Sequence, residues 1–454
     1  MQTGTERWSS TFAFYLAAIG AAVGLGSVWR FPYLAGANGG SAFIFVFVLA
    51  CLAIATPLLV AEYMIGRRAR LSPPQAAGAV AASFGRSRGW NAIGQLGMWA
   101  ALLIMSYYTT IAGWVMAYIW KCGSGELTAL SRSAVPGYFH HFLANPFEIG
   151  AWQLAFLALV AVISAFGVTR GIEVATKIRA PGLLILLLIL VVYALCTGDV
   201  RHGLAFAFAP DFSRITGRVL LAAVGQAFFA TGVGMGMMLA YGAYVPAGTS
   251  LVRSSLIVSA SIIIVSMLAT LIIFPLVYGY GLNPAQGPDL VFNVLPIAFA
   301  EMPGGRVIGT LFFLLLLLSA LTPSLAGLEP AVAWLQQSRG LSRPWAALAG
   351  CALIWLLGIG SLLSFNVGAA WHPFAGLPRL GDMTIFDLLD FFASNIALTV
   401  GALLTCLLVG WRLPRRFADE EMAEDSPAVR TGVLGLLRYV CPIAIAAVLL
   451  AALL

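Results

Sequence analysis

The sequence predicts an all-helical integral membrane protein, and three features of its composition support this fold class. Apolar residues make up 61% of the 454 positions, charged residues only 9%, and the mean hydropathy is +0.94. Soluble domains are roughly 45–50% apolar and about 25% charged, so a water-soluble enzyme could not bury this much hydrocarbon. The apolar residues also fall into long runs, most of them close to the ~20 residues that a membrane-spanning helix needs.

Eleven such runs follow one another with short loops between them. They predict spans at 11–37, 41–66, 92–120, 152–170, 175–199, 216–244, 254–280, 305–336, 344–364, 384–411 and 434–454. The remaining residues are too few for a separate soluble domain. We therefore expect residues 1–454 to form a single transmembrane domain.

The loop cations predict how the chain is oriented. The loops on the side of the N-terminus carry most of the Lys and Arg residues, among them Arg67, Arg68 and Arg86, and Arg179 is counted with this side. Cytoplasmic loops are enriched in such cations. We expect a bacterial-type plasma membrane, a cytoplasmic N-terminus and, after eleven spans, an external C-terminus. This topology accounts for the formal net charge of +7, so no nucleic-acid partner is expected.

Two spans carry clusters of glycine in their middle. Residues 20–27 of the first span read GAAVGLGS, and residues 231–236 of the sixth read TGVGMG. Glycine costs a helix interior about 1 kcal/mol relative to alanine, so such clusters favour local unwinding. Close packing of helices through small residues is the alternative explanation for either cluster alone.

The positions of these two spans favour unwinding. Spans one and six correspond in two five-helix halves, about 8–200 and 214–412, with an extra span at about 434–454. Because five is an odd number, the halves have inverted topology, and paired interrupted spans in inverted repeats mark the midplane site of a transporter. Broken helices expose N–H groups for an anion and carbonyls for a cation. A zwitterionic amino acid matches both.

Motifs along the whole chain resemble one transporter family. Trp8, GAAVGLGSVWRFPY at 20–33 and NGG at 38–40 together resemble the first-helix signature of the neurotransmitter:sodium symporter family, which has the LeuT fold. Further matches, in one register, are Pro57, Glu62, Gly66-Arg67, Tyr107-Tyr108, Gly171-Ile172-Glu173, Pro181, GQAFF at 225–229, Leu321-Thr322, Glu329-Pro330 and FDLLDF at 386–391. A chain that ends after an eleventh span resembles a bacterial form of the family.

The resemblance implies secondary active uptake of a neutral, hydrophobic amino acid by alternating access, without enzymatic activity. The Tyr108 hydroxyl would bind the substrate carboxylate, and Gly24, where amine transporters carry an aspartate, favours an amino acid over a monoamine. Gly232, Met235 and Gly327 are expected to leave space for a medium-to-large side chain. The implied substrate-binding residues are Ala21, Ala22, Gly24, Leu25, Gly26, Ile104, Tyr108, Phe229, Thr231, Gly232, Met235 and Gly327.

The resemblance also implies gates and one structural acid. Arg30 would pair with Asp390, with Gln226 nearby, to close the outer side over the substrate. Glu62 would hydrogen-bond the unwound backbone of span six. At the inner gate, where relatives pair two charges, this chain has Thr5 and Gln337, which predicts a weaker closure.

Sodium is the cofactor that the resemblance implies, and no organic cofactor is expected. The second sodium site would use the carbonyls of Gly20, Val23 and Ser319 and the Thr322 hydroxyl, although Pro323 replaces a usual serine. The first site would keep only the Ala22 carbonyl and the Ser27 hydroxyl, because Ala230 and Ile262 stand where ligands are expected. Proton-coupled or uncoupled exchange, and a sensor that binds an amino acid without transporting it, therefore remain alternatives. The sequence leaves the oligomeric state open.

Overall fold

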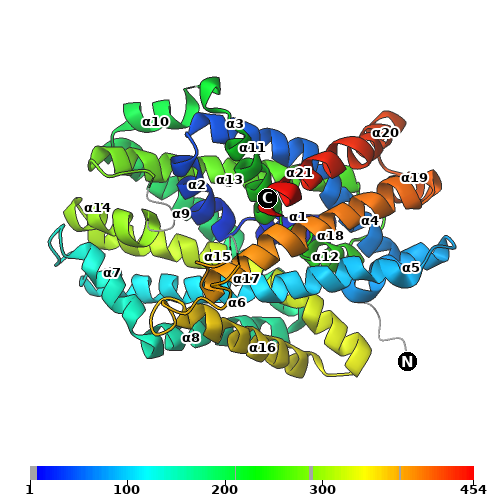
Figure 1. The fold of residues 1–454 in the computed structure, drawn as a ribbon, viewed down its shortest axis with the longest axis horizontal. Coiled ribbons are helices and arrows are strands. Elements are labelled where there is room, and N and C mark those ends of the chain that lie inside the picture. The colour runs from blue at the N-terminus through cyan, green and yellow to red at the C-terminus, as the bar shows by residue number, and fades with distance from the viewer. Residues whose placement is uncertain (1–7, 210, 286–289, 378–379, 454) are drawn as a thin grey trace.

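The computed structural model describes residues 8–209, 211–285, 290–377 and 380–453, and these form helices joined by loops. The chain folds into a bundle whose long axis lies horizontally in Figure 1. The helices are α1 (Thr11–Ala22), η1 (Gly26–Arg30), α2 (Phe31–Ala37), α3 (Ser41–Ala50), η2 (Cys51–Ala55), α4 (Thr56–Ala69), α5 (Pro73–Ser83), η3 (Arg88–Asn91), α6 (Ala92–Ser124), α7 (Val135–Ala144), α8 (Pro146–Ala165), η4 (Val168–Ile172), α9 (Glu173–Thr197), α10 (Val200–Phe208), η5 (Phe212–Arg214), α11 (Gly217–Thr231), α12 (Met237–Ala243), α13 (Leu251–Gly279), η6 (Leu290–Val294), α14 (Leu295–Glu301), α15 (Gly305–Arg339), α16 (Arg343–Leu363), α17 (Ile385–Asp390), η7 (Phe391–Ala397), α18 (Leu398–Leu407), η8 (Leu408–Arg412), α19 (Arg415–Glu421), α20 (Pro427–Gly435), η9 (Leu436–Val440) and α21 (Cys441–Leu453).

The predicted spans are found in the structure. Within the described ranges, nine helices are long and apolar enough to cross a membrane, and α1 with η1–α2 makes a tenth. The shorter apolar helix α11, together with α12, accounts for the eleventh. The fourth span starts at Pro146 and the last at Pro427, earlier than predicted, because a capping Asn or Ser followed by proline begins each helix before the apolar run.

Both predicted helix breaks are present, which confirms the interruption of spans one and six. In the first span α1 ends at Ala22, Val23 is extended, and the helix resumes at Gly26 after a bend of 49°. In the sixth span α11 ends at Thr231, and the glycines at 232, 234 and 236 have φ of 66°, 86° and 70°. Only glycine adopts such angles without strain. The positions of these glycines therefore determine where the sixth span unwinds.

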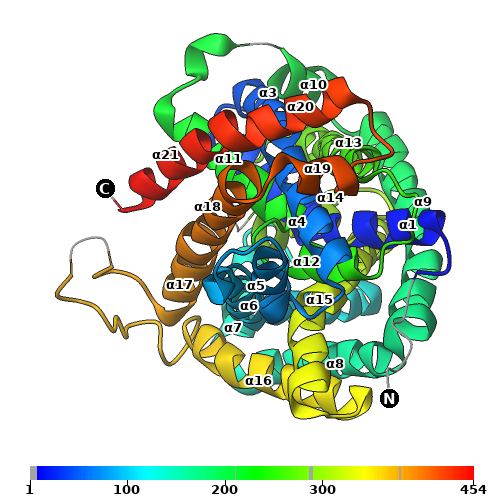
Figure 2. The same cartoon turned by 90° about the vertical axis from the view of Figure 1, so that its right-hand side faces the viewer.

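The second half of the sixth span lies inside the bundle. Viewed along the bundle, α12 and α15 lie near the centre, whereas α8, α9 and α16 lie at the rim (Figure 2). Burial agrees with this arrangement, because 89% of the apolar 18-residue stretch in the span of α6 is buried, against only 28% of the corresponding stretch in the span of α9. The exposed, apolar faces of the rim helices suit contact with lipid.

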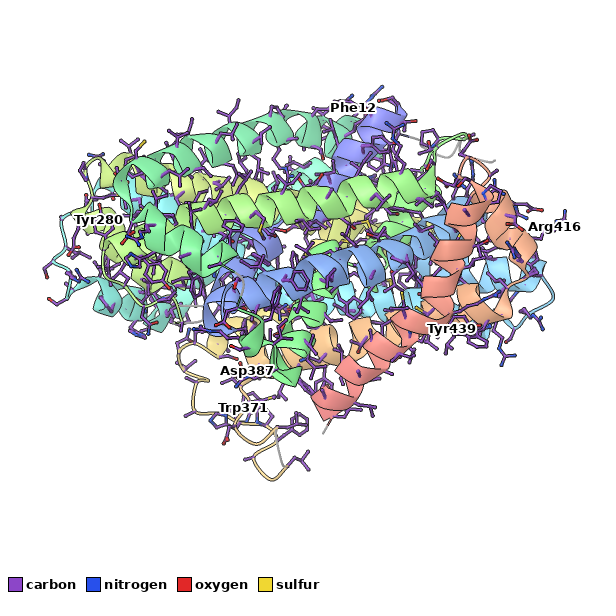
Figure 3. The ribbon with its side chains drawn as sticks, turned by 90° about the horizontal axis from the view of Figure 1, so that it is seen from above. Phe12, Tyr280, Trp371, Asp387, Arg416 and Tyr439 are labelled. Carbon is purple, nitrogen blue, oxygen red and sulfur yellow. The ribbon has the colours of Figure 1, made fainter. Side chains whose placement is uncertain are left out.

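Several connections that the sequence treats as plain loops contain helices. α5 and α19 lie at the end of the bundle where the N-terminus is found, here called the N-terminal end, and α7, α10 and α14 lie at the opposite end (Figure 1). Arg416 and Tyr280 mark these two ends in Figure 3. α5, α7 and α14 have a proline in the first turn, where its missing N–H costs no helical hydrogen bond. These helices close off the two ends of the core.

Candidate functional site

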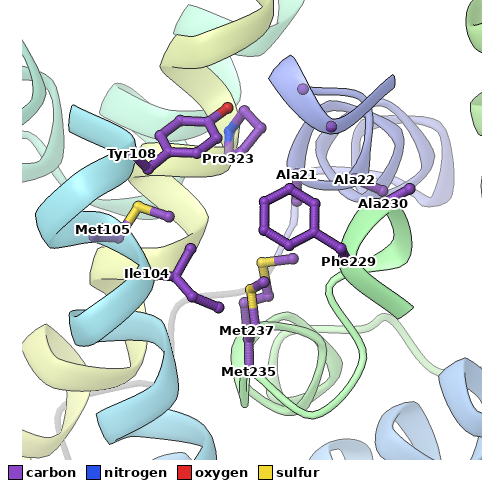
Figure 4. A pocket seen from close by; sticks show the side chains of 12 residues that line it. Ala21, Ala22, Ile104, Met105, Tyr108, Phe229, Ala230, Met235, Met237 and Pro323 are labelled. Atoms are coloured by element: carbon purple, nitrogen blue, oxygen red, sulfur yellow. The ribbon is translucent and has the colours of Figure 1, made fainter. Parts of the chain in front are cut away.

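A small cavity lies at the level of the two helix breaks, between α6, α15 and the broken spans (Figure 4). The space open to the centre of a water molecule is about 20 Å³, enough for roughly one ordered water. Its wall is mostly apolar, and the Tyr108 hydroxyl faces it. The lining residues are Ala21, Ala22, Gly24, Gly26, Ile104, Met105, Tyr108, Phe229, Ala230, Met235, Met237 and Pro323.

Four residues of the predicted pocket, Leu25, Thr231, Gly232 and Gly327, do not line this cavity. Leu25 contributes through its backbone, whose N–H donates to the Tyr108 hydroxyl at 3.2 Å. Thr231 turns back onto its own helix, where its hydroxyl donates to a carbonyl one turn earlier at 2.7 Å. Because its proton is already donated within the helix, the Thr231 hydroxyl could serve a ligand only as an acceptor.

Two methionines fill the space that the predicted pocket glycines were expected to leave. A Cβ on Gly327 would lie 3.0 Å from Met105 Cγ, and a Cβ on Gly232 only 1.5 Å from Met237 Cε. The sequence analysis missed both methionines, although Met105 lies three residues before Tyr108 and so shares its helix face. Methionine side chains are unbranched and flexible. They are therefore the groups that can move aside for a larger ligand.

The polar end of the cavity forms where the first span breaks. Gly24 fits between two side chains, because a Cβ there would lie 2.9 Å from the Tyr108 hydroxyl and 2.6 Å from Pro323 Cγ. The helix that resumes at Gly26 directs the positive end of its dipole to the same place, although the Ser27 and Val28 N–H groups donate to the Gly24 carbonyl. This end of the cavity suits an anionic group such as a carboxylate.

The predicted outer gate lies between this cavity and a vestibule at the end opposite the N-terminus. Arg30 Nη2 lies 4.0 Å from Asp390 Oδ2, and both side chains are only partly exposed. The Arg30 guanidinium also covers the Phe229 ring at 4.1 Å, a cation–π contact. Tyr107 donates to Asp390 Oδ1 at 2.7 Å, and the Gln226 side-chain N–H donates to the Gly26 carbonyl at 2.7 Å. The vestibule, of about 450 Å³, includes Arg30, Phe229 and Asp390 in its wall.

The N-terminal end is closed by a tryptophan. Trp8 is 3% exposed, and its rings lie edge-on to Tyr241 and Tyr244 with centroids 5.2 and 6.2 Å apart. The Trp8 backbone N–H donates to the Tyr244 carbonyl at 3.3 Å, and its indole N–H donates to the Tyr241 carbonyl at 3.4 Å. The backbone N–H of the next residue, Ser9, donates to Glu173 Oε2 at 3.2 Å. The cavity is thus closed at both ends.

Charges at the N-terminal end are arranged differently from the family pattern. Thr5 lies outside the described residues, and Gln337 accepts a hydrogen bond from the Ser72 N–H at 2.7 Å. An ion pair is nevertheless present nearby, because the fully buried Glu329 lies 2.7 Å from Arg343. The sequence analysis quoted Glu329 as a motif residue but did not find its partner, which follows on the next helix.

Glu62 lies against the unwound part of the sixth span. Its side chain is 1% exposed, and Oε1 accepts the Gly234 N–H at 2.7 Å. Gly234 has no room for a side chain, because a Cβ would lie 2.6 Å from the Leu398 carbonyl oxygen. A buried backbone N–H without a partner is costly. The Glu62 carboxyl supplies that partner.

Two of the three carbonyls predicted for the second sodium site, those of Gly20 and Val23, accept hydrogen bonds from an arginine. Arg179 of α9 is 3% exposed, and its Nη1 donates to the carbonyls of Gly20 at 3.5 Å, Val23 at 3.4 Å and Leu318 at 3.1 Å. The sequence analysis counted Arg179 with the loop cations, and this was wrong. Helical spacing would have indicated the buried position of Arg179, since it shares the buried face of α9 with Thr176 and Leu183.

These residues do not fit a sodium ion. Hard cations lie about 2.3–2.6 Å from their oxygen ligands, and a guanidinium nitrogen already lies 3.1–3.5 Å from three carbonyls. A second unit charge about 4 Å from the guanidinium would be repelled by about 4 kcal/mol at an effective dielectric constant of ~20. Pro323 brings no hydroxyl, and the Ser319 hydroxyl donates within its own helix. In this structure the Gly20 and Val23 carbonyls thus face a cation of the chain itself, the Arg179 guanidinium.

The first sodium site also offers few oxygens. Ser27 is fully buried and its hydroxyl has no partner among the described residues. Ala230 and Ile262, which replace the usual ligands, are 2% and 0% exposed and apolar. Because a hard cation needs about six oxygen ligands, the Ala22 carbonyl and the Ser27 hydroxyl are too few.

Comparisons with known proteins identify the family. The sequence matches the Sodium:neurotransmitter symporter family over residues 5–132 and 146–453. It is 36% identical over 447 residues to an uncharacterized sodium-dependent transporter, YhdH, of Bacillus subtilis, covering 98% of this chain and 97% of the relative. The chain belongs to the sodium:neurotransmitter symporter family.

Further relatives agree with the family assignment. An uncharacterized sodium-dependent transporter of Haemophilus influenzae is 33% identical over 415 residues, covering 90% of this chain and 89% of the relative. The crystal structure of MhsT in complex with L-phenylalanine superposes with a TM-score of 0.91 at 38% identity, covering 99% of this chain and 100% of that one. The fold of this symporter-family chain is thus the LeuT fold, with broken spans one and six and an eleventh span.

Proposed function

We propose that this chain is a secondary transporter that moves a neutral, hydrophobic α-amino acid across the membrane by alternating access. The observation that carries the proposal is the closed cavity at the two helix breaks. The Tyr108 hydroxyl and the positive end of the helix that resumes at Gly26 would bind the carboxylate. Free carbonyls at the end of α1 would bind the ammonium group, because the end of a helix carries a partial negative charge.

The remainder of the wall supports an apolar substrate side chain. Ile104, Met105, Phe229, Met235 and Met237 face the cavity, and a charged side chain there would lose its hydration without gaining a partner. The MhsT structure, which contains L-phenylalanine, supports the same substrate class. Because the cavity holds only about 20 Å³, binding requires Met105 and Met237 to change rotamer.

Transport needs a site that opens to each side in turn. The Arg30–Asp390 pair and Phe229 would open toward the vestibule, and the Trp8 closure would open at the N-terminal end. We propose that the N-terminal end faces the cytoplasm, in keeping with its loop cations. The cavity and the closures at its two ends therefore support binding of the substrate and its passage through the chain.

Uptake into proteoliposomes tests the proposal. We expect radiolabelled phenylalanine and leucine to enter liposomes that contain the protein, and lysine and glutamate to be excluded by the apolar wall. Liposomes without protein provide the control. Tight binding of amino acids without any uptake or exchange would instead indicate a sensor.

The same assay separates two modes of driving transport. Relatives described as sodium-dependent transporters favour coupling to sodium. The hydrogen bonds from the Arg179 guanidinium to the Gly20 and Val23 carbonyls favour a second candidate. This candidate is exchange or facilitated passage of the amino acid without sodium. Replacing sodium with choline at constant ionic strength would abolish uptake in the first case and leave it unchanged in the second.

Replacing Tyr108 with phenylalanine should weaken amino acid binding by at least about tenfold, because hydrogen bonds to charged groups contribute about 1.5–3 kcal/mol. The variant keeps the ring and removes the hydroxyl near the carboxylate position. Isothermal titration with phenylalanine measures the change. Tyr439→Phe is the matched control, since Tyr439 is 59% exposed and lies on the outside of the bundle (Figure 3). Unchanged affinity in Tyr108→Phe would contradict the assigned carboxylate position.

A further inference from the structure

Three backbone carbonyls from two helices converge on one guanidinium in the middle of the bundle. Gly20 and Val23 belong to the end of α1, and Leu318 belongs to α15. Arg179 Nη1 lies 3.5, 3.4 and 3.1 Å from their oxygens. Arg179 itself comes from a third element, α9, so the contact joins three spans at the level of the first helix break.

These carbonyls need a cationic or hydrogen-bonding partner. The last carbonyls of a helix have no donor within it, and the end of α1 carries a partial negative charge. On α15, Pro323 has no N–H for the Ser319 carbonyl, and Arg179 donates to the adjacent Leu318 carbonyl. The end of α1 therefore presents oxygen atoms that only a group from outside the helix can satisfy.

Arg179 fits this role in charge, position and packing. Arginine stays protonated in proteins and presents its donors in a rigid, planar fork. A Cβ on Gly20 would lie 2.9 Å from Thr322 Cγ2, 3.1 Å from Thr176 Cγ2 and 3.5 Å from Arg179 Nη2. The guanidinium is thus packed between Gly20 and neighbouring side chains. The Thr322 hydroxyl, a predicted sodium ligand, is buried and has no partner among the described residues.

We propose that the Arg179 guanidinium is the resident cation of the second ion site, and that this chain binds its amino acid without sodium. The inference rests on the proposed function and specifies its coupling. The arginine holds the end of α1 in the conformation that binds the substrate, which makes it a positioning residue. The first site does not replace the lost ion, because Ala230 and Ile262 carry no oxygen in their side chains.

The proposal has a thermodynamic consequence. A gradient concentrates a substrate only if its ion binds and leaves in each cycle, and a cation that is part of the chain cannot leave. Arg179 also retains its proton. Transport should therefore bring the amino acid to equilibrium or exchange it, without accumulation driven by a sodium gradient.

Binding of radiolabelled phenylalanine to the purified full-length chain tests the proposal. Sodium chloride is compared with choline chloride at equal ionic strength, and binding of radioactive sodium is measured in parallel. We expect the dissociation constants for phenylalanine to agree within about twofold and the wild-type chain to bind no sodium. A dissociation constant more than about tenfold lower in sodium would overturn the inference and leave the proposed function standing. Absence of amino acid binding in both salts would contradict the proposed function itself.

Variants distinguish a resident cation from a simple structural contact. Arg179→Ala, combined with Pro323→Ser to supply a hydroxyl, should lose at least about tenfold in affinity in choline and regain it in sodium, with radioactive sodium now bound. A merely structural arginine would not create a sodium requirement. Sodium-independent binding at wild-type affinity in this double variant would overturn the proposal.

Two further variants control for folding and for charge. Arg170→Ala removes an exposed arginine near the start of the same span and should behave like the wild type in both salts. Arg179→Lys keeps the positive charge and is expected to bind phenylalanine more weakly but still without sodium. If the double variant is unstable, the sodium response of Arg179→Lys decides the question, and a new sodium requirement there would contradict the inference.

Discussion

Replacing Gly24 with alanine is expected to weaken amino acid binding by about 100-fold, near the upper end of the roughly 1–3 kcal/mol that overpacking costs. The added Cβ would lie 2.6 Å from Pro323 Cγ and 2.9 Å from the Tyr108 hydroxyl. Neither a proline ring nor a tyrosine hydroxyl bonded to the Leu25 N–H can move without disturbing the carboxylate position. Titration with phenylalanine measures the loss.

Gly225 provides the matched control for Gly24. It lies in α11, and nothing lies within 4 Å of a Cβ built there. Gly225→Ala should therefore bind phenylalanine like the wild type. Near-normal binding by Gly24→Ala would show that the carboxylate does not lie at this break. Gly24→Asp should not create an amine transporter, because the larger side chain has even less room.

The second large effect is expected from Glu62→Ala. This change removes the acceptor of the Gly234 N–H, which Glu62 Oε1 binds at 2.7 Å in a fully buried position. An unsatisfied buried donor costs about 1–3 kcal/mol, and the deleted side chain adds the cost of a cavity. We expect a lower melting temperature and loss of amino acid binding together, because the unwound segment of span six would lose its fixed position.

Two further variants show which property of Glu62 causes the effect of Glu62→Ala. Glu62→Gln keeps a carbonyl oxygen where Oε1 lies and should recover most of the stability and binding. Glu424→Ala removes an exposed acid and should change neither. If Glu62→Ala melts and binds like the wild type, the Glu62–Gly234 contact does not hold the break.

Much of the fold could be predicted from local patterns. Apolar runs gave the spans, since a bilayer core requires about 20 apolar residues for each helix. Glycine clusters gave the two breaks, because positive φ angles such as those of Gly232 and Gly236 are strained for other residues. The motif around Tyr108 placed this residue beside the first break, and the structure brings its hydroxyl to the Leu25 N–H.

Contacts between distant segments could not be predicted in this way. Met105 of α6 occupies the space beside Gly327 of α15, a helix that lies far away in the sequence. The predicted partners of the gates were also incomplete, because Tyr107 bonds to Asp390 and Gln226 bonds to the Gly26 carbonyl.

Arg179 shows most clearly the difference between what the sequence determines and what the tertiary structure determines. The sequence by itself determined that the chain crosses a membrane many times and that two of its spans unwind, because hydrophobicity and backbone strain are local properties. Only the tertiary structure decided that an arginine from α9 lies on the Gly20, Val23 and Leu318 carbonyls. The position of a charge relative to atoms more than a hundred residues away depends on how the helices pack, and no local pattern encodes it.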